Sequence, residues 1–367
     1  MRSRYSISIV LVVSLCFACQ SAMAADVPSY GKREARYYQQ VDSQTVRCQL
    51  CPHQCLLING MRGICRVREA QGGKLYTYVY GNPCSYHVDP IEKKPIYHML
   101  PGTLSFSIAT AGCNLRCRFC QNWTISQRTP EEVNSLEMGP QEVIAATLRS
   151  QCDSIAYTYS EPIIFYEYMF DTAKLAREQG LKNVMVTAGY INEQPLRELC
   201  KYIDAANVDL KGFDEKYLLE VCGQKLTPLL EALKIFKEEG VWIEITNLIV
   251  PTLNDDMETI KEMCIWIKDN LGDEVPLHFS RFSPMYQLKN LYLTPLATME
   301  KAKEVADSAG LKFVYIGNVP GHPAQHTYCP DCKNMLIERV GYSIKQNNIV
   351  DGKCKFCGRP IPGIWTK

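Results

Sequence analysis

Three closely spaced cysteines, Cys113, Cys117 and Cys120, are the residues of this chain best suited to chemistry. Three thiolates in a C-x3-C-x2-C pattern can hold a [4Fe-4S] cube by three of its irons, whereas ferredoxin-type cubes use four cysteines. The remaining iron then stays open to a substrate or cofactor, much as a catalytic zinc keeps an open position. A structural zinc knuckle that lacks its fourth ligand is the alternative. The motif directly follows an expected strand and precedes Gln121-Asn122, and both features argue against the knuckle.

A second set of cysteines lies near the N-terminus, in the pattern Cys48-x2-Cys51-x3-Cys55-x9-Cys65. Short spacings of this kind favour metal ligation over a disulfide framework. We expect the set to bind zinc or a second iron–sulfur cluster, and the pattern does not decide between the two. A disulfide knot is the alternative if the protein is exported.

A third set lies in the tail, where Cys329 and Cys332 form one C-x2-C knuckle and Cys354 and Cys357 form another, 21 residues further on. That separation is just outside the usual zinc-ribbon spacing. Four thiolates in a tetrahedron suit zinc or a rubredoxin-like iron. We expect structural zinc in a closed site, which stabilises this part of the chain.

The whole chain has 367 residues, enough for one large domain with small modules. Hydrophobic residues make up 46% and charged residues 22%, as in ordinary soluble proteins. The net charge of +1 gives no general electrostatic reason to expect nucleic acid as a partner. Seven of the 18 cysteines are scattered outside these three sets, and four of the seven are expected to be small buried hydrophobic side chains: Cys152, Cys200, Cys222 and Cys264.

The elements that must position the first triad alternate between strands and helices. We expect strands at 104–109, 154–159, 183–188, 207–210, 241–250, 276–282 and 312–316. We expect helices at 141–151, 163–179, 194–202, 227–239, 255–270 and 297–309. This alternation predicts an α/β fold with a parallel sheet, in a partial or complete (β/α) barrel. Active-site groups then belong at the carboxyl ends of the strands, where the triad lies.

The sequence divides into four regions on this interpretation. Residues 1–24 resemble a leader, and residues 25–100 form a loop-like, cysteine-bearing N-terminal region. Residues 101–322 form the barrel, and residues 323–367 form a zinc-ribbon-like C-terminal module. Both small flanks look too short to hold a core alone, so bound metal would help them fold.

The triad, with Phe119 just before its third cysteine, resembles the cluster motif of the radical S-adenosylmethionine (SAM) superfamily. The resemblance implies a [4Fe-4S] cluster on the triad, SAM on its open iron, and Phe119 and Asn122 beside the cofactor. Tyr159-Ser160-Glu161-Pro162 resembles the superfamily's Gly-Gly-Glu-Pro element without its two glycines, and implies that Glu161 receives the SAM amino group.

Further groups follow the next expected strands in order. Thr187 ends the third strand and is expected to face the SAM carboxylate. Asp209-Leu210-Lys211 ends the fourth and resembles a ribose-contacting Asp-Leu-Lys. One such residue after a strand is usually only a solvated loop residue. Several in order at successive strand ends are a stronger indication of one binding site.

Flanking motifs narrow the resemblance. Residues 48–55, 89–98 and 317–322 and the tail knuckles are similar to the radical SAM enzyme of the AmmeMemoRadiSam system, a relative of pyruvate formate-lyase activating enzymes. The resemblance runs from about residue 48 to residue 357. It implies Memo-like and Ammecr-like protein partners, a flavodoxin-like or ferredoxin-like reductant and a substrate that is not identified.

The activity implied by the resemblance is reductive cleavage of SAM. The 5′-deoxyadenosyl radical so formed would abstract hydrogen from a substrate held in the barrel. One alternative is an activase that installs a glycyl radical on a partner protein. A second alternative is a non-enzymatic iron–sulfur or metal-binding electron-transfer protein, which would leave the motifs at the strand ends without a role.

The first 24 residues give conflicting indications about location. Arg2 and Arg4, an apolar run over 7–18 and Ala22-Met23-Ala24 are typical of a secretory signal peptide. The run is too short for a comfortable membrane span. The leader therefore suggests export or membrane association, whereas iron–sulfur chemistry suggests the cytoplasm. A wrongly assigned start codon is the alternative.

Overall fold

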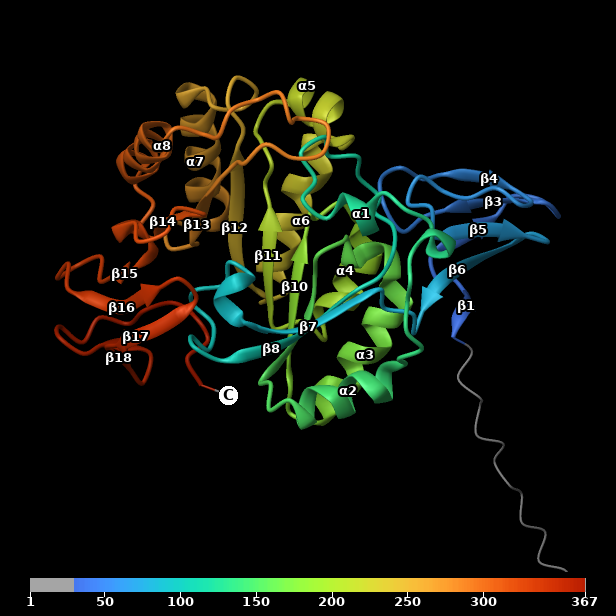
Figure 1. The fold of residues 1–367 in the computed structure, drawn as a ribbon, viewed down its shortest axis with the longest axis horizontal. Coiled ribbons are helices and arrows are strands. Elements are labelled where there is room, and N and C mark those ends of the chain that lie inside the picture. Colours follow the sequence, from blue (N-terminus) through green and yellow to red (C-terminus); the bar gives the residue numbers. More distant parts are fainter. Residues whose placement is uncertain (1–29, 367) are drawn as a thin grey trace, which may run out of the picture.

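The protein, seen here as a computed structural model, is described over residues 30–366. An eight-stranded sheet runs through its centre in the order β14-β13-β12-β11-β10-β9-β8-β7 (Figure 1). Its parallel strands are β8 (Leu104–Ala109), β9 (Ser154–Tyr157), β10 (Lys182–Thr187), β11 (Ala205–Asp209), β12 (Trp242–Ile249), β13 (Leu277–Arg281) and β14 (Val314–Gly317). β7 (Ser85–Pro90) pairs antiparallel with β8 and forms the other edge. β7 and β14 do not pair, so the barrel is partial.

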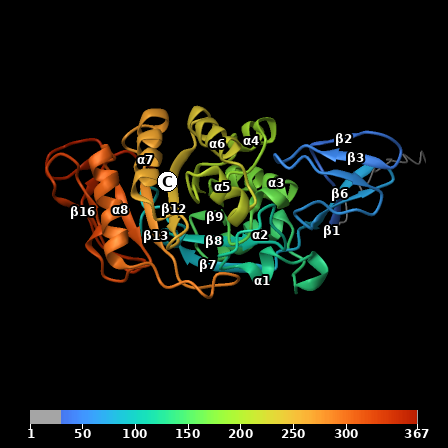
Figure 2. The same cartoon turned by 90° about the horizontal axis from the view of Figure 1, so that it is seen from above.

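Helices connect the parallel strands and cover the outer face of the sheet (Figure 2). They are α1 (Trp123–Ser126), α2 (Pro140–Arg149), α3 (Tyr166–Glu178), α4 (Glu193–Cys200), α5 (Glu215–Tyr217), α6 (Leu226–Glu238), α7 (Met257–Leu271) and α8 (Leu296–Ala309). Leu229, Leu233 and Phe236 of α6 recur at helical spacing and are fully buried against the sheet. The predicted α/β fold with a mostly parallel sheet is therefore confirmed.

The expectation of a loop-like region before residue 100 is wrong. Its described part forms two small sheets, β1 (Gly31–Glu34) with β6 (Lys74–Tyr80) and β5 (Arg68–Gln71), and β2 (Tyr38–Gln40) with β3 (Thr45–Cys48) and β4 (Leu56–Ile58). In β6 the buried residues Leu75, Thr77 and Val79 alternate with more exposed ones, as in a half-buried strand. These strands are short and lie among cysteines and turn residues, which obscures the alternation in the sequence.

The tail forms its own small sheet of β15 (Thr327–Tyr328), β16 (Met335–Val340) and β17 (Ser343–Asn347). A short pair, β18 (Ile349–Val350) and β19 (Lys353–Cys354), carries the second knuckle. The N-terminal sheets and this C-terminal module lie on opposite sides of the large sheet in both views (Figures 1 and 2).

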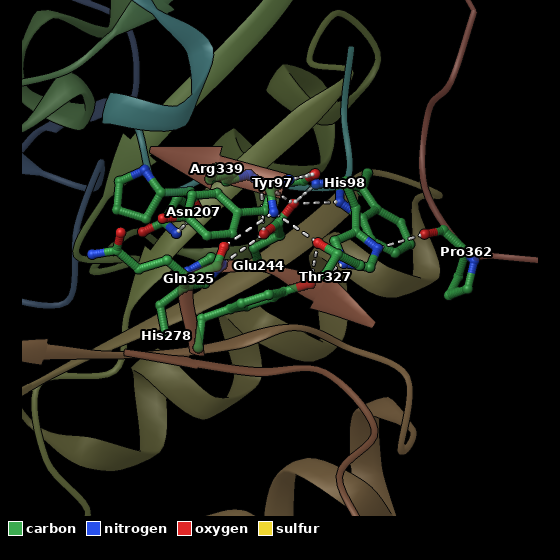
Figure 3. A network of polar contacts seen from close by, with 12 residues as sticks. Tyr97, His98, Asn207, Glu244, His278, Gln325, Thr327, Arg339 and Pro362 are labelled. Atoms are coloured by element: carbon green, nitrogen blue, oxygen red, sulfur yellow. Dashed lines mark hydrogen bonds and ion pairs between the residues drawn. The ribbon is translucent and has the colours of Figure 1, made fainter. Parts of the chain in front are cut away.

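A buried polar network ties the C-terminal module to the barrel (Figure 3). Glu244, near the start of β12, accepts hydrogen bonds from the backbone N–H groups of Tyr97 and His98 at 2.9 and 2.8 Å and from Nε2 of His278 at 2.6 Å. Arg339 of β16 donates to the Tyr97 carbonyl at 2.9 Å. Burial opposes ionisation of Glu244, but these hydrogen bonds and the neighbouring histidines lower its pKa to about 2.

The network lies toward the amino ends of the strands, away from the triad. The end of the 89–98 motif therefore packs the base of the barrel. The predicted leader at residues 1–24 lies outside the described residues. Within residues 30–366, no helix has both the length and the apolar character needed to cross a bilayer.

Candidate functional site

The triad lies in the loop between β8 and α1, and backbone hydrogen bonds fix its path. The N–H of Arg116 donates to the carbonyl of Cys222 at 2.8 Å, and that of Arg118 donates to Val221 at 2.9 Å. Gly112, which precedes the triad, has a φ of +90° that favours glycine, and its N–H donates to Ile125 at 3.0 Å. The loop is thereby held against the short helical segment Leu218–Cys222.

Apolar side chains surround the three sulfurs. The cluster packed around Cys113, Cys117 and Cys120 consists of Leu115, Phe119, Ala188, Tyr190, Tyr217, Leu218, Val221, Cys222, Val250, Phe282 and Leu288. Phe119 is only 6% exposed, and it contributes to this wall. An apolar, enclosed site of this kind excludes water from whatever it binds.

Cys222 is a part of the site that sequence reasoning missed. It is fully buried, as expected, but it also forms a hydrogen bond with Cys117, and this bond lowers the pKa of Cys117. Burial raises the pKa of Cys113 and of Cys120. Cys222 therefore contacts the triad directly through Cys117. No spacing in the sequence signals this contact, because Cys222 comes from a distant segment.

Glu161 follows β9 and is buried beside the triad. Its carboxylate accepts hydrogen bonds from the Thr187 hydroxyl at 2.6 Å and from the backbone N–H of Ala188 at 2.8 Å. Burial raises its pKa, and these hydrogen bonds oppose the shift. The carboxylate is close enough to Cys113 to raise the pKa of that thiol as well. The ends of β9 and β10 thus fix one acidic group next to the cysteines.

Asp209 and Lys211 lie at the end of β11. Nζ of Lys211 is 2.6 Å from Oδ2 of Asp209. Burial opposes the charge of Lys211, but the neighbouring Asp209 raises its pKa above the usual range, with smaller contributions from Cys117 and Cys222. The structure therefore brings Asp209 and Lys211 to the same end of the barrel as the triad, Glu161 and Thr187.

Tyr159 occupies the position of the first glycine of the resembled element, and its backbone keeps the conformation that glycine favours. Its φ is +63°, and its carbonyl accepts a hydrogen bond from Nδ2 of Asn122 at 2.7 Å. Its hydroxyl contacts Asp89, which also pairs with the buried Lys94 at 2.6 Å. These contacts hold a tyrosine in a left-handed conformation that is strained for a residue with a Cβ atom.

An open cavity adjoins the site on this side. It is lined by Ser85, His87, Asp89, Lys93, Asn122 and Tyr159. The start of the 89–98 motif therefore faces a polar space next to Asn122, while its end packs the barrel base. The cavity reaches the triad loop at Asn122, two residues after Cys120.

The donor set fits an iron–sulfur cube with one open iron. Three cysteines of one loop pack against the same apolar cluster, next to one carboxylate. Two buried polar atoms near the strand ends, Oγ of Ser160 and Oδ1 of Asn247, have no hydrogen-bond partner among the described residues. A polar cofactor such as SAM would satisfy groups of this kind.

The N-terminal cysteines are arranged differently. Cys48, Cys51, Cys55 and Cys65 all line one cavity beneath the triad loop. Burial, with a smaller contribution from the neighbouring Cys48, raises the pKa of Cys51 to about 12 and that of Cys65 to about 11. Every cysteine within residues 30–366 is free, so the disulfide alternative receives no support there.

The C-terminal cysteines converge on one point. The Cys329 and Cys357 sulfurs are 3.6 Å apart, and those of Cys332 and Cys354 are 3.7 Å apart. Zinc–sulfur bonds of about 2.3 Å in a tetrahedron place sulfurs about 3.8 Å apart. The four residues form a group that can hold a metal ion, and this is the geometry expected of a closed, structural site.

Comparisons with known proteins identify relatives of the chain. The radical SAM superfamily profile matches residues 107–266. An uncharacterised protein of Methanocaldococcus jannaschii is 48% identical over 331 residues, which cover 90% of this chain and 98% of that protein. The pyruvate formate-lyase-activating enzyme of Clostridium pasteurianum is 28% identical over 206 residues, covering 52% and 83% of the two chains. A solved radical SAM methyltransferase from Sphaerobacter thermophilus superposes with a TM-score of 0.48 at 11% identity, covering 80% and 79%.

Proposed function

This chain belongs to the radical SAM superfamily, and we propose that it is an enzyme that holds a [4Fe-4S] cluster on Cys113, Cys117 and Cys120 and uses SAM to act on a substrate inside the barrel. The observation that supports this most is the buried carboxylate of Glu161 beside three cysteines in an apolar wall. When bound, the cluster and SAM supply one-electron cleavage of SAM and hydrogen abstraction from a substrate.

The chain's own residues bind and orient the cofactor. Glu161 is fixed by Thr187 and by the Ala188 N–H, so its remaining acceptor capacity is directed to the SAM amino group. Asp209 accepts from the ribose hydroxyls, and Lys211 holds it in place through their 2.6 Å ion pair. Phe119 and Asn122 complete the pocket, and the apolar cluster keeps water out.

The substrate enters the cavity between Asn122, Tyr159 and Asp89. Its polar lining suits a substrate that carries hydrogen-bonding or charged groups. The reductant is a flavodoxin-like or ferredoxin-like protein, and Memo-like and Ammecr-like proteins are partners in this proposal. The C-terminal quartet binds zinc, since its sulfur separations match a tetrahedral zinc site.

The test is anaerobic turnover of SAM with a strong reductant. The wild type produces 5′-deoxyadenosine, and Cys120→Ala does not. Cys200→Ala, on α4 away from the triad, is the matched control and keeps the activity. Production of 5′-deoxyadenosine by Cys120→Ala contradicts the assignment of the cluster ligands. Cluster reduction without SAM cleavage in the wild type favours a non-enzymatic electron-transfer protein.

A second candidate function is the activation of a glycyl-radical enzyme. It is favoured by the similarity to the pyruvate formate-lyase-activating enzyme of Clostridium pasteurianum. In this case the substrate is a backbone glycine of a partner protein, which must reach into the cavity. A glycyl radical signal in electron paramagnetic resonance (EPR), seen only with that partner, SAM and reductant together, distinguishes this function from small-molecule chemistry.

A further inference from the structure

The N-terminal cysteines line one cavity, and their sulfurs are not gathered on one point as those of the C-terminal quartet are. All four line one cavity, together with Leu57, Ile163 and Ile164. Yet within residues 30–366 only the C-terminal quartet brings three or more such ligand atoms within 4.8 Å of one another. Four thiolates that share one zinc must lie close together, whereas thiolates that bind different irons of one cube lie further apart. The same chain thus contains one compact quartet and one open quartet.

We propose that Cys48, Cys51, Cys55 and Cys65 bind a second [4Fe-4S] cluster. Four cysteines fill all four irons, as in ferredoxin-type cubes, so this cluster has no open iron for SAM or substrate. Its chemistry is therefore electron transfer.

Local structure holds the loops around these sulfurs in place. A Cβ atom added at Gly63 would lie 3.6 Å from the Cys55 sulfur and 3.7 Å from the Cys65 sulfur, so Gly63 lies directly beside both thiols. Gln54 and Arg66, the neighbours of Cys55 and Cys65, adopt φ values of +45° and +69°. Non-glycine residues hold such conformations only where the surrounding structure imposes them. The surrounding structure therefore holds the loops that carry Cys55 and Cys65 in defined conformations.

The cavity also offers a buried hydrogen-bond donor. Arg68 is 1% exposed and lies on the cavity wall. Its NH2 group pairs with both carboxylate oxygens of Glu167, at 2.6 and 2.7 Å, so its charge is balanced. Its Nε has no hydrogen-bond partner among the described residues, and a cluster sulfur would satisfy this buried N–H group.

His53 links the N-terminal module to the triad loop. Its Nε2 is 2.7 Å from the backbone carbonyl of Asn114, which follows Cys113 directly. A carbonyl only accepts hydrogen bonds, so Nε2 carries the proton and Nδ1 is the unprotonated nitrogen of the neutral ring.

The two cysteine sets are in direct contact through this loop. Asn114 lines the N-terminal cavity. A Cβ atom added at Gly112 would lie 2.5 Å from the Cys65 carbonyl oxygen, so the two backbones touch. The cavity also borders Ile163, two residues after Glu161. A cluster in the cavity is therefore a neighbour of the triad's cluster.

This contact gives the second cluster its role, which rests on the proposed function. One electron enters the N-terminal cluster from an external one-electron donor protein and passes to the triad's cluster. The N-terminal cluster is reduced and then reoxidised by one electron in each transfer, so it ends unchanged. No proton or bond is exchanged in this step.

Metal analysis of full-length protein made anaerobically with iron and sulfide tests the site. The triad variant Cys113→Ala/Cys117→Ala/Cys120→Ala is compared with the quartet variant Cys51→Ala/Cys55→Ala and the control Cys200→Ala. The wild type and the control should contain about eight irons and about eight sulfides per chain, and each cluster variant about four. The reduced triad variant should give an EPR signal that SAM does not change, while the signal of the quartet variant should respond to SAM.

The outcomes separate this inference from the proposed function. A triad variant with at most one iron and two zinc ions overturns the second cluster in favour of zinc. A triad variant with about four irons supports the second cluster, even if the wild type fails to cleave SAM. This result remains decisive for the second cluster if the quartet variant does not fold. For the role, a flavodoxin-type donor should reduce the triad's cluster at least about tenfold more slowly in the quartet variant than in the control. An unchanged rate overturns the role.

Discussion

The two cysteine quartets of this chain have the same four ligands but differ in the separation of their sulfurs and in their surroundings. The C-terminal quartet is compact, with sulfurs 3.6 and 3.7 Å apart, and it lies on the far side of the barrel from the N-terminal sheets (Figure 1). The N-terminal quartet lines a cavity and touches the triad loop. Ligand type and number alone therefore do not assign a role to a cysteine set. The separation of the sulfurs and the neighbours of the site do.

The largest expected effect is the loss of the C-terminal metal. Cys354→Ser should remove one metal ion per chain and destabilise the module by roughly 4 kcal/mol or more, because a structural metal contributes directly to folding. The apolar residues packed around it, among them Phe313, Leu336 and Ile337, then lose their support. Thermal unfolding and zinc analysis check this, with Cys200→Ala as the control. The iron content should not change. A loss of iron in this variant contradicts the view that the C-terminal quartet is independent of the iron–sulfur sites.

The next effect concerns the attachment of the C-terminal module. Glu244→Gln should destabilise the protein by about 3 kcal/mol, because the backbone N–H groups of Tyr97 and His98 lose a charged, fully buried acceptor. Glu258→Gln, on the exposed face of α7, is the control. Zinc should leave this variant more readily than iron. Equal lability of both metals contradicts the view that the network serves only one side of the molecule.

The same residue makes stability depend on pH. The folded pKa of Glu244, about 2, is below the ordinary glutamate value of about 4.3. Its contribution is therefore complete above about pH 4.5 and is lost as the pH falls toward 2. Urea unfolding of wild type and Glu244→Gln at pH 5 and pH 3.5 should show a smaller loss of stability in the variant. An equal loss of stability in both proteins contradicts the predicted contribution of ionised Glu244.

A smaller effect is expected at the contact between the triad loop and the N-terminal quartet, and it should leave the C-terminal quartet unchanged. Gly112→Ala should cost about 2 kcal/mol, since its Cβ would meet the Cys65 carbonyl at 2.5 Å. Gly180→Ala is a matched control, because Gly180 also has a positive φ but no atom within 4 Å of an added Cβ. Iron should be lost faster from Gly112→Ala than from Gly180→Ala, with zinc unchanged. Equal stability and equal rates of iron loss in the two variants contradict a role for the contact between Gly112 and Cys65.

The smallest effect concerns Cys222, which lies outside all three cysteine sets. Removing the hydrogen bond to Cys117 in Cys222→Ala should lower the reduction potential of the triad's cluster by about 40 mV, the equivalent of roughly 1 kcal/mol for one electron. Cys264→Ala, buried but remote from the triad, should leave the potential unchanged. A redox titration followed by EPR measures both. An unchanged potential in Cys222→Ala shows that the hydrogen bond does not act on the cluster.

The parallel strands and their helices were predictable because each has a local cause. Buried parallel strands are short apolar runs, and Gly240 and Gly310 follow the helices α6 and α8 in conformations that glycine favours. The gathering of Glu161, Thr187 and Asp209 at one end also follows from their positions after successive strands. Their roles toward SAM remain predictions.

The parts that escaped prediction depend on contacts between distant segments. β7 lies at the edge of the sheet, where side chains such as Tyr86 and Val88 are exposed. Its sequence therefore lacks the continuous apolar run that marks the buried central strands. Cys222 reaches Cys117 only after α5 and the segment that follows it have folded back onto the triad loop. Nothing local indicates that Tyr159 takes a positive φ, since Asp89 holds it from another strand.

The ion pair between Arg68 and Glu167 joins residues 99 positions apart. The cavity that contains the N-terminal cysteines is likewise closed by Asn114, Ile163 and Ile164, which come later in the chain. A ribosome makes the N-terminus first. The four thiols are therefore synthesised well before the walls that enclose them, and the pocket stays accessible until α3 has emerged. Whatever this pocket binds is sealed in by the folding of the barrel.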